Sequence, residues 1–122
     1  MNDCIIGVGS NIEPEENIRK MLCFLAKDHL VKKHSTWIKT TPIGITDQDD
    51  FINGAVRVKT QHSMDEFNQY LKNLEDRMGR DRSLPKFGPR VIDLDIVVWN
   101  GEIVDKDYHT RDFVKNSVDQ LL

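Results

Sequence analysis

The chain has 122 residues, of which 39% are hydrophobic and 30% are charged, and 17 Lys and Arg against 20 Asp and Glu give a formal charge of −3. This length predicts a single domain over residues 1–122, large enough for its own hydrophobic core. The composition excludes a disordered or fibrous chain, and the mild negative charge argues against nucleic-acid and membrane binding, which need a dominant basic surface.

The N-terminal residues and the cysteines indicate where the protein resides. The short apolar run at residues 4–8 has no basic segment before it, so no signal sequence is expected, and no run reaches the ~20 apolar residues of a membrane helix. Cys4 and Cys23 lie in apolar stretches without a paired spacing, which favours buried free thiols over a disulfide. We therefore expect a cytoplasmic protein.

The first half of the chain is predicted to form a strand, a helix and two further strands. The first strand covers residues 4–8, and the helix begins at Pro14, where a missing N–H is tolerated. Its apolar residues follow the spacing of one buried stripe: Ile18, Met21, Leu22, Leu25 and Ala26. The second strand is predicted over residues 31–39 and the third over residues 51–60, where apolar and polar residues alternate.

The second half adds a helix, a strand and a short helical tail. Ser63 and Glu66 have the spacing of a capping box, and Gly79 is predicted to end the helix. The apolar stripe of this helix is Phe67, Tyr70, Leu71, Leu74 and Met78. A fourth strand at residues 92–99 completes the order β-α-β-β-α-β, and a short helix is expected at residues 112–122. This order predicts an α+β, ferredoxin-like fold, with a four-stranded antiparallel sheet and both helices on one face.

Two aspartates in the fourth predicted strand are the first candidates for chemistry. Asp93 and Asp95 are two residues apart, so a strand would place them on one face with Cα atoms about 6.5–7 Å apart. Carboxylates this close repel one another unless a cation lies between them, and Mg²⁺ binds carboxylate together with phosphate oxygens. A solvated strand face is the alternative interpretation of an isolated pair.

The segment before these aspartates is rich in positive charge. Residues 79–90 contain Arg80, Arg82, Lys86 and Arg90 against the single Asp81, in a loop with two Gly and two Pro. A solvated basic loop explains the charge alone about as well as a binding site does. Next to a carboxylate pair, however, mobile cations favour a site for nucleotide phosphates and their metal.

The run FGPRVIDLDIV at residues 87–97 closely resembles the signature of the 6-hydroxymethyl-7,8-dihydropterin pyrophosphokinase family of folate biosynthesis. Further similar segments are GSN at 9–11, TTPIG at 40–44, FINGAV at 51–56 and GRDR at 79–82. The resemblance thus extends over nearly the whole chain. The family fold is ferredoxin-like, in agreement with the predicted element order.

The resemblance implies transfer of pyrophosphate from ATP to the hydroxymethyl group of a reduced pterin, with release of AMP. Asp93 and Asp95 would bind two Mg²⁺ ions, and Arg80, Arg82 and Arg90 would be catalytic residues beside them. No covalent protein intermediate is needed, because positioning and charge neutralisation supply the rate.

The resemblance also implies a set of ATP-binding residues: Glu75, Arg82, Lys86, Arg90, His109 and Arg111. Glu75 is expected on the exposed side of the second helix. Lys86 replaces an Arg that is frequent in the family, so it would act as a point charge and not as a bidentate fork.

The pterin site implied by the resemblance pairs aromatic faces with directional polar groups. Phe51 and Phe113 would cover the two faces of the ring, and Asn53 would bind its edge. The backbone of Thr40, Thr41 and Ile43 would complete that edge. Without the resemblance, both phenylalanines would be interpreted as core residues.

The C-terminal part departs from the family. The stretch between Asp95 and Arg111 is short, and the chain ends at Leu122, where family members usually continue. His109 is therefore open to two interpretations, as the nucleotide-binding histidine of the family or as a plain loop histidine. The alternative function is a diverged pterin- or nucleotide-binding relative with lost or altered transfer.

An RNA-recognition module shares the predicted element order. It requires aromatic residues on the first and third strands, and residues 4–8 contain none. We therefore expect a monomer that acts on small molecules, without nucleic-acid or membrane partners.

Overall fold

One antiparallel sheet holds the strands in a computed structural model that describes all of residues 1–122. The strands are β1 (Asn2–Ser10), β2 (Leu30–His34), β3 (Ile38–Thr40), β4 (Phe51–Thr60), β5 (Asp93–Trp99) and β6 (Glu102–Ile103). Their order is β2-β4-β1-β5-β6, and β3 also pairs with β4. The central strand β1 therefore has β4 on one side and β5 on the other.

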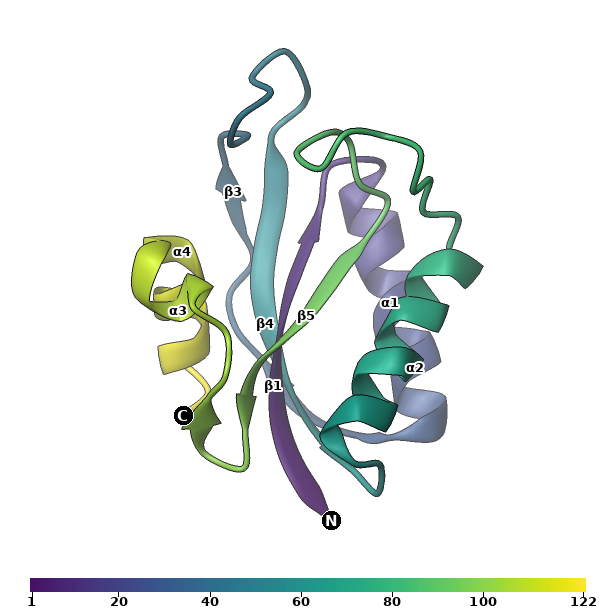
Figure 1. The fold of residues 1–122 in the computed structure, drawn as a ribbon, viewed down its shortest axis with the longest axis vertical. Coiled ribbons are helices and arrows are strands. Elements are labelled where there is room, and N and C mark those ends of the chain that lie inside the picture. Colours follow the sequence, from purple (N-terminus) through teal and green to yellow (C-terminus); the bar gives the residue numbers. More distant parts are fainter.

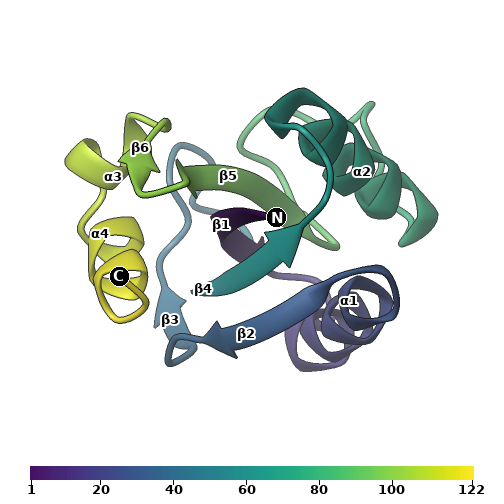
Figure 2. The same ribbon diagram turned by 90° about the horizontal axis from the view of Figure 1, so that it is seen from below.

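Helices cover both faces of this sheet (Figures 1 and 2). On one face lie α1 (Pro14–Asp28) and α2 (Met64–Arg77), and on the other lie α3 (Asp107–Thr110) and α4 (Asp112–Asp119). The larger hydrophobic cluster packs α1 and α2 on the sheet, and a smaller one lies under α4. None of these helices combines the length and apolar character that crossing a membrane requires.

The predicted α+β class and the central β-α-β-β-α-β order are confirmed, but the predicted four-stranded sheet with helices on one face is wrong. The additional strand β6 follows a tight turn at Asn100 and Gly101, both with positive φ. Asn-Gly between two strands is a strong hairpin signal, so the sequence did contain this information. The tail then returns across the sheet because α4 has an apolar side, with Val118 buried.

The prediction of one strand over residues 31–39 is also wrong. β2 and β3 pair with different parts of β4, and the chain leaves the sheet between them. There the Ser35 hydroxyl accepts the N–H of Ala55 at 2.8 Å. The ring of Trp37 lies over Gly54, where a Cβ would be only 2.4 Å from its Cε3 atom. The interruption thus lets a large side chain pack against glycine in the neighbouring strand.

The regular alternation of faces in β5 holds only for its first half. The pairing of β5 with β1 shifts register between Ile5, opposite Val98, and Ile6, opposite Ile96. Through this bulge both Val97 and Val98 pack in the cluster under α4. Val98 therefore does not share a face with Leu94, whereas Asp93 and Asp95 precede the bulge and lie on one face, as predicted.

The two cysteines are free thiols, as expected, but only one is buried. Cys4 lies in the core, and burial raises the pKa of its thiol to about 12. Cys23 is exposed on α1, so the prediction of two buried thiols is wrong for this residue. Apolar neighbours in the sequence did not reveal that Cys23 lies on the solvent side of the helix.

A histidine at the end of α1 makes the fold sensitive to acid. The ring of His29 packs against Tyr70 and Phe67, with centroids 4.5 and 5.1 Å away, and its Nδ1 has no hydrogen-bond partner. Burial, followed by the charge of His62, lowers the pKa of His29. Protonation therefore favours the unfolded chain, so stability falls as the pH drops below the ordinary value of about 6.5.

We expect His29→Phe to reduce this acid sensitivity. Urea unfolding at pH 7.5 and pH 5.0 should show a smaller loss of unfolding free energy in the variant than in the wild type. All other titrating groups are common to both proteins, so equal losses would contradict the assignment to His29.

Candidate active site

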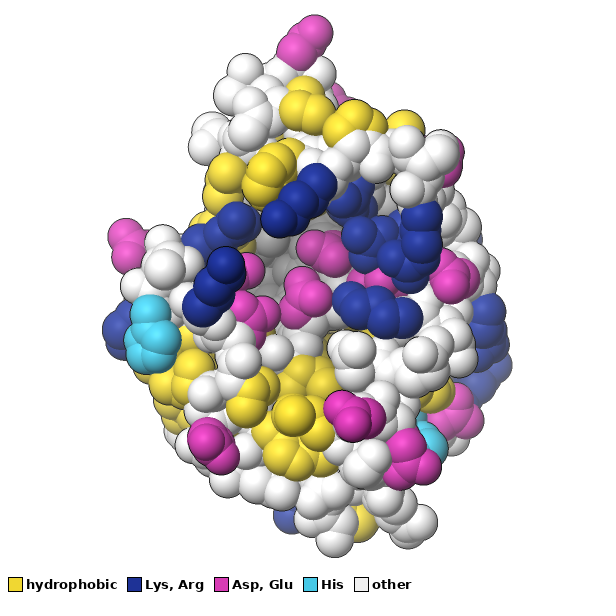
Figure 3. All heavy atoms as spheres, viewed as in Figure 1, with side chains coloured by type: hydrophobic (Ala, Val, Ile, Leu, Met, Phe, Trp, Pro, Cys, Tyr) yellow, Lys and Arg dark blue, Asp and Glu magenta, His cyan; other side chains and the backbone are white.

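A hollow opens over the face of the sheet that carries α3 and α4. Figure 3 shows acidic side chains in its floor and Lys and Arg side chains around its rim. The cavity comprises about 890 Å³, including its open mouth. Eleven of the site residues expected from the sequence line this cavity: Thr40, Thr41, Ile43, Phe51, Asn53, Lys86, Arg90, Asp93, Asp95, Arg111 and Phe113.

The floor is built by β1 and β5. Asp93 lies opposite Gly9 and Asp95 opposite Gly7 in the register of these strands. Both glycines line the cavity. Because neither has a side chain, the space beside the two carboxylates stays open. This role of Gly7 and Gly9 was not predicted, although the two glycines alternate along the first strand.

The charge of Asp95 is close enough to influence the ionisation of Asp93. Burial, and then the negative charges of Asp95 and Glu75, raise the pKa of Asp93 to about 6. The side chains of Asp93 and Asp95 are still 40% and 49% exposed, so a ligand can reach them from the cavity. The site therefore concentrates negative charge that its own cations only partly balance.

Each aspartate has one cation beside it. Arg80 Nη1 lies 3.3 Å from Asp93 Oδ1, and Lys72 Nζ lies 3.3 Å from Asp95 Oδ1. Both distances are long for charge-assisted hydrogen bonds, which are usually 2.7–2.9 Å. Lys72 was not among the predicted site residues, because a lysine on a helix has no signal in the sequence that distinguishes it from a surface residue.

Glu75 is the organising group behind these cations. Its carboxylate is fully buried, accepts the Leu94 N–H at 2.7 Å and binds Arg80 Nη1 at 2.6 Å. Arg82 and Lys72 approach it at 3.2 and 3.4 Å. The prediction that Glu75 lies on the exposed side of the helix is wrong, and it does not line the cavity. Its burial is tolerated because three cations and a backbone N–H surround it.

The remaining loop cations lie in different positions. Arg82 is half exposed and binds Asp76 at 2.8 Å, outside the cavity lining. Lys86 lines the cavity from the rim. Arg90 is buried, and its guanidinium donates to backbone carbonyls of its own loop: Pro85, Lys86, Gly88 and Pro89. In this arrangement Arg90 holds the loop in shape.

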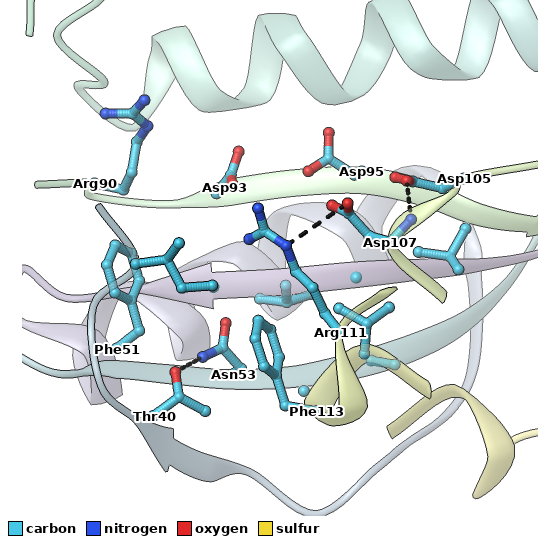
Figure 4. A pocket seen from close by; sticks show the side chains of 18 of the residues that line it. Thr40, Phe51, Asn53, Arg90, Asp93, Asp95, Asp105, Asp107, Arg111 and Phe113 are labelled. Atoms are coloured by element: carbon cyan, nitrogen blue, oxygen red, sulfur yellow. Dashed lines mark hydrogen bonds and ion pairs between the residues drawn. The ribbon is translucent and has the colours of Figure 1, made fainter. Parts of the chain in front are cut away.

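The C-terminal segment adds a cation and two further carboxylates to the cavity. Arg111 projects between the strands and α4, and its Nε lies 3.7 Å from Asp107 Oδ1 (Figure 4). Asp105 and Asp107 also line the cavity, although neither was predicted. His109 is exposed with its ring against Tyr108 at 5.1 Å, and it does not line the cavity. His109 thus lies on the exposed side of α3, outside the cavity.

The other end of the cavity is suited to a flat ligand. Phe51 and Phe113 come from β4 and α4 and lie on either side of Asn53 in the close view (Figure 4). The Asn53 carboxamide donates from Nδ2 to the Thr40 hydroxyl. This bond turns the carbonyl oxygen of Asn53 toward the cavity, beside Gly9. Two aromatic side chains and a fixed acceptor are the groups that a planar heterocycle requires.

Gly9 provides a direct test of this end of the cavity. A Cβ at Gly9 would lie 2.8 Å from Asn53 Oδ1, too close for either atom to stay in place. We expect Gly9→Ala to displace the Asn53 carboxamide and weaken binding of a planar ligand about tenfold, the cost of one hydrogen bond. The measurement is ligand affinity by fluorescence quenching, with Asn73→Ala as the control. Asn73 is exposed on α2, outside the cavity lining, and the affinity of this control should stay that of the wild type.

The carboxylate pair also meets the requirements of a magnesium site. No group of three or more His, Cys, Asp or Glu side chains could hold a metal ion by itself. One or two carboxylates, completed by phosphate oxygens and water, are the usual protein share of a Mg²⁺–nucleotide site. Asp93 and Asp95 offer hard oxygen donors in an accessible position, with side chains 40% and 49% exposed. The residues present therefore fit Mg²⁺.

Comparison with known proteins identifies related sequences. The family model of 7,8-dihydro-6-hydroxymethylpterin-pyrophosphokinase matches residues 5–122. The 2-amino-4-hydroxy-6-hydroxymethyldihydropteridine pyrophosphokinase of Bacillus subtilis is 34% identical over 109 residues, 87% of this chain and 65% of that protein. The enzyme of the same name from Haemophilus influenzae is 33% identical over 121 residues, 89% of this chain and 74% of that protein.

A longer relative contains the same region as one part. The folate synthesis bifunctional protein of Arabidopsis thaliana is 35% identical over 107 residues, which are 86% of this chain and 22% of that protein. The chain thus spans less than two thirds of the length of the Arabidopsis and Bacillus relatives.

Proposed function

Because the chain belongs to the 7,8-dihydro-6-hydroxymethylpterin-pyrophosphokinase family, we propose that it transfers pyrophosphate from ATP to 6-hydroxymethyl-7,8-dihydropterin, as a single domain over residues 1–122. The observation that carries this proposal is the composition of one cavity. Two carboxylates, a rim of cations and an aromatic slot with a fixed acceptor all face the same space.

The two substrates are assigned to opposite ends of this cavity. The pterin ring lies between Phe51 and Phe113, with its polar edge toward Asn53 and the backbone of residues 40–43. The triphosphate lies over the cationic side, near Lys86 and Arg111. The hydroxymethyl oxygen then attacks the β-phosphorus, AMP leaves, and the hydroxyl proton passes to water.

The protein contributes to this reaction by positioning and by charge. Asp93 and Asp95 would hold two Mg²⁺ ions, and bound Mg²⁺ would supply neutralisation of the charge that develops on the phosphates. Arg80 stays fixed by Glu75, so its guanidinium remains beside Asp93. Arg82 and Arg90 reach the phosphates after exchanging their present partners, Asp76 and the loop carbonyls.

The residues assigned to the nucleotide end of the cavity differ from the expectation at Glu75 and His109. Glu75 acts behind the cations and not as a direct ATP ligand, since it is fully buried. Arg111 takes part from the cavity wall, whereas His109 points to solvent and has no assigned role. We further place the protein in the cytoplasm as a monomer acting on small molecules, with two free thiols in support of a reducing compartment.

The deciding experiment combines the protein with Mg²⁺, ATP and the hydroxymethyl-dihydropterin and measures AMP and pterin pyrophosphate. We expect both products in equal amounts. Folded protein that binds the pterin but releases no AMP would instead indicate a binding protein without transfer activity.

A further inference from the structure

Lys72 lies on the face of the sheet opposite the cavity, and its ammonium group reaches Asp95 of the carboxylate pair. It lies on α2, one helical turn before Glu75, and its side chain is 29% exposed. Its ammonium group donates to the Leu94 carbonyl at 2.8 Å and contacts Asp95 at 3.3 Å and Glu75 at 3.4 Å. These three acceptors account for all three N–H groups of a lysine.

The position of this ammonium group matters because Asp95 has no other cation. Arg80 is the cation beside Asp93, and the buried Glu75 carboxylate contacts both Arg80 and Lys72. Three carboxylates and the cations Lys72, Arg80 and Arg82 thus form one charge network. Within it, the ammonium of Lys72 is the counter-ion of Asp95.

A divalent cation at Asp95 would change this balance. It would bring two positive charges close to an ammonium group that has one, so the two cations compete for the same carboxylate. Lys72 can move away more easily than Arg80, because it is more exposed and its shortest bond is to a neutral carbonyl. Its flexible stem allows the charge to swing toward the cavity.

We propose that Lys72 is a further positioning residue of this site: it neutralises Asp95 in the metal-free protein and exchanges that carboxylate for the phosphates of the bound nucleotide. This inference rests on the proposed function for the identity of the nucleotide, but not for the competition with a metal ion. The contact with Lys72 holds the Asp95 carboxylate in place before the substrates arrive. After the exchange, the ammonium group lies beside the triphosphate, and Arg80 and Arg82 remain as the cations around Glu75.

The first test uses Mn²⁺ alone, with no nucleotide present. Lys72→Met removes the competing charge while keeping an unbranched side chain, so we expect Mn²⁺ to bind three- to tenfold more tightly, as measured by electron paramagnetic resonance. Lys72→Arg keeps the charge and should bind Mn²⁺ as the wild type does. Lys20→Met, on the exposed surface of α1, controls for the loss of one positive charge and should also leave the affinity unchanged.

The second test measures a non-hydrolysable ATP analogue with Mg²⁺ by titration calorimetry. Lys72→Met should weaken its binding three- to tenfold, opposite in sign to the effect on Mn²⁺, and Lys72→Arg should restore it. A purely structural role of Lys72 would weaken both ligands together. The proposal would be overturned by weaker binding of both ligands, by unchanged affinities in Lys72→Met, or by a lack of Mn²⁺ binding in all of the proteins.

These results are independent of whether pterin is the acceptor. The Mn²⁺ titration requires only the carboxylate at Asp95, so a protein without transfer activity can still show the tighter binding. Circular dichroism and thermal unfolding of each variant establish that the fold is retained. If Lys72→Met does not fold, the comparison of Lys72→Arg with Lys72→Gln replaces it with the same expected signs.

Discussion

Asp95→Asn is expected to reduce the rate of pyrophosphate transfer by about 10²–10³-fold or more, the usual loss when one electrostatic partner of a transition state is removed. The amide has the shape of the carboxylate but no charge, so it holds Mg²⁺ poorly. The measurement is AMP release at saturating ATP and pterin. Because Asp95 is half exposed and lies at the cavity floor, the fold should be unaffected.

The control for this variant is Asp65→Asn. Asp65 is an exposed aspartate in the first turn of α2, the helix that carries Lys72 and Glu75, and it does not line the cavity. It should keep nearly wild-type turnover while changing the net charge by the same amount. Turnover of Asp95→Asn close to that of this control would remove the carboxylate pair from the mechanism.

Asp95→Asn has a second readout that does not depend on activity. Burial is the largest cause of the raised pKa of Asp93, and the charge of Asp95 is the next. Removing that charge should lower the pKa of Asp93 from about 6 toward the ordinary value, without reaching it because burial remains. A carboxyl titration followed by NMR in the absence of metal measures this shift, and an unchanged pKa would show that the two groups do not interact.

The sequence predicted those parts of the site that depend on local periodicity. Asp93 and Asp95 share a face because alternation in a strand is a property of neighbouring residues. The stripes of α1 and α2 were predicted for the same reason. In α1, the buried Ile18, Met21 and Leu25 and the half-buried Leu22 confirm the prediction, whereas the prediction is wrong for Ala26, which is exposed. The cavity lining at residues 40–53 came from the resemblance, since nothing in the composition of that loop distinguishes it.

The parts that were missed depend on contacts between distant segments. Glu75 follows the buried Leu74, but a charged residue is buried only if partners arrive from elsewhere in the chain. Here they come from the loop, as Arg80 and Arg82, and from the Leu94 N–H of β5. The role of Lys72 arises from the same packing of α2 on β5. Spacing along one helix cannot reveal such an arrangement.

The last expected result concerns the pterin end of the cavity. Asn53→Ala removes a side-chain acceptor that the structure fixes there, through the bond from Asn53 Nδ2 to Thr40. The amino group of the proposed pterin then loses its partner, at a cost of about 1.4–2.8 kcal/mol, or roughly a 10–100-fold increase in KM for pterin. Turnover at saturating pterin should change much less, because Asn53 does not contact the phosphate end of the cavity.

Thr40→Val separates orientation from the acceptor itself. Valine has the shape of threonine but cannot accept from Asn53, so the carboxamide is free to rotate and to present its amino group instead of its oxygen. We expect KM for pterin to rise about three- to tenfold, less than in Asn53→Ala, since the oxygen still faces the cavity part of the time. KM for ATP should remain unchanged in both variants, because the two substrates occupy opposite ends of the cavity. An equal rise in both KM values would show that β4 shapes the whole cavity and that Asn53 does not recognise the pterin edge.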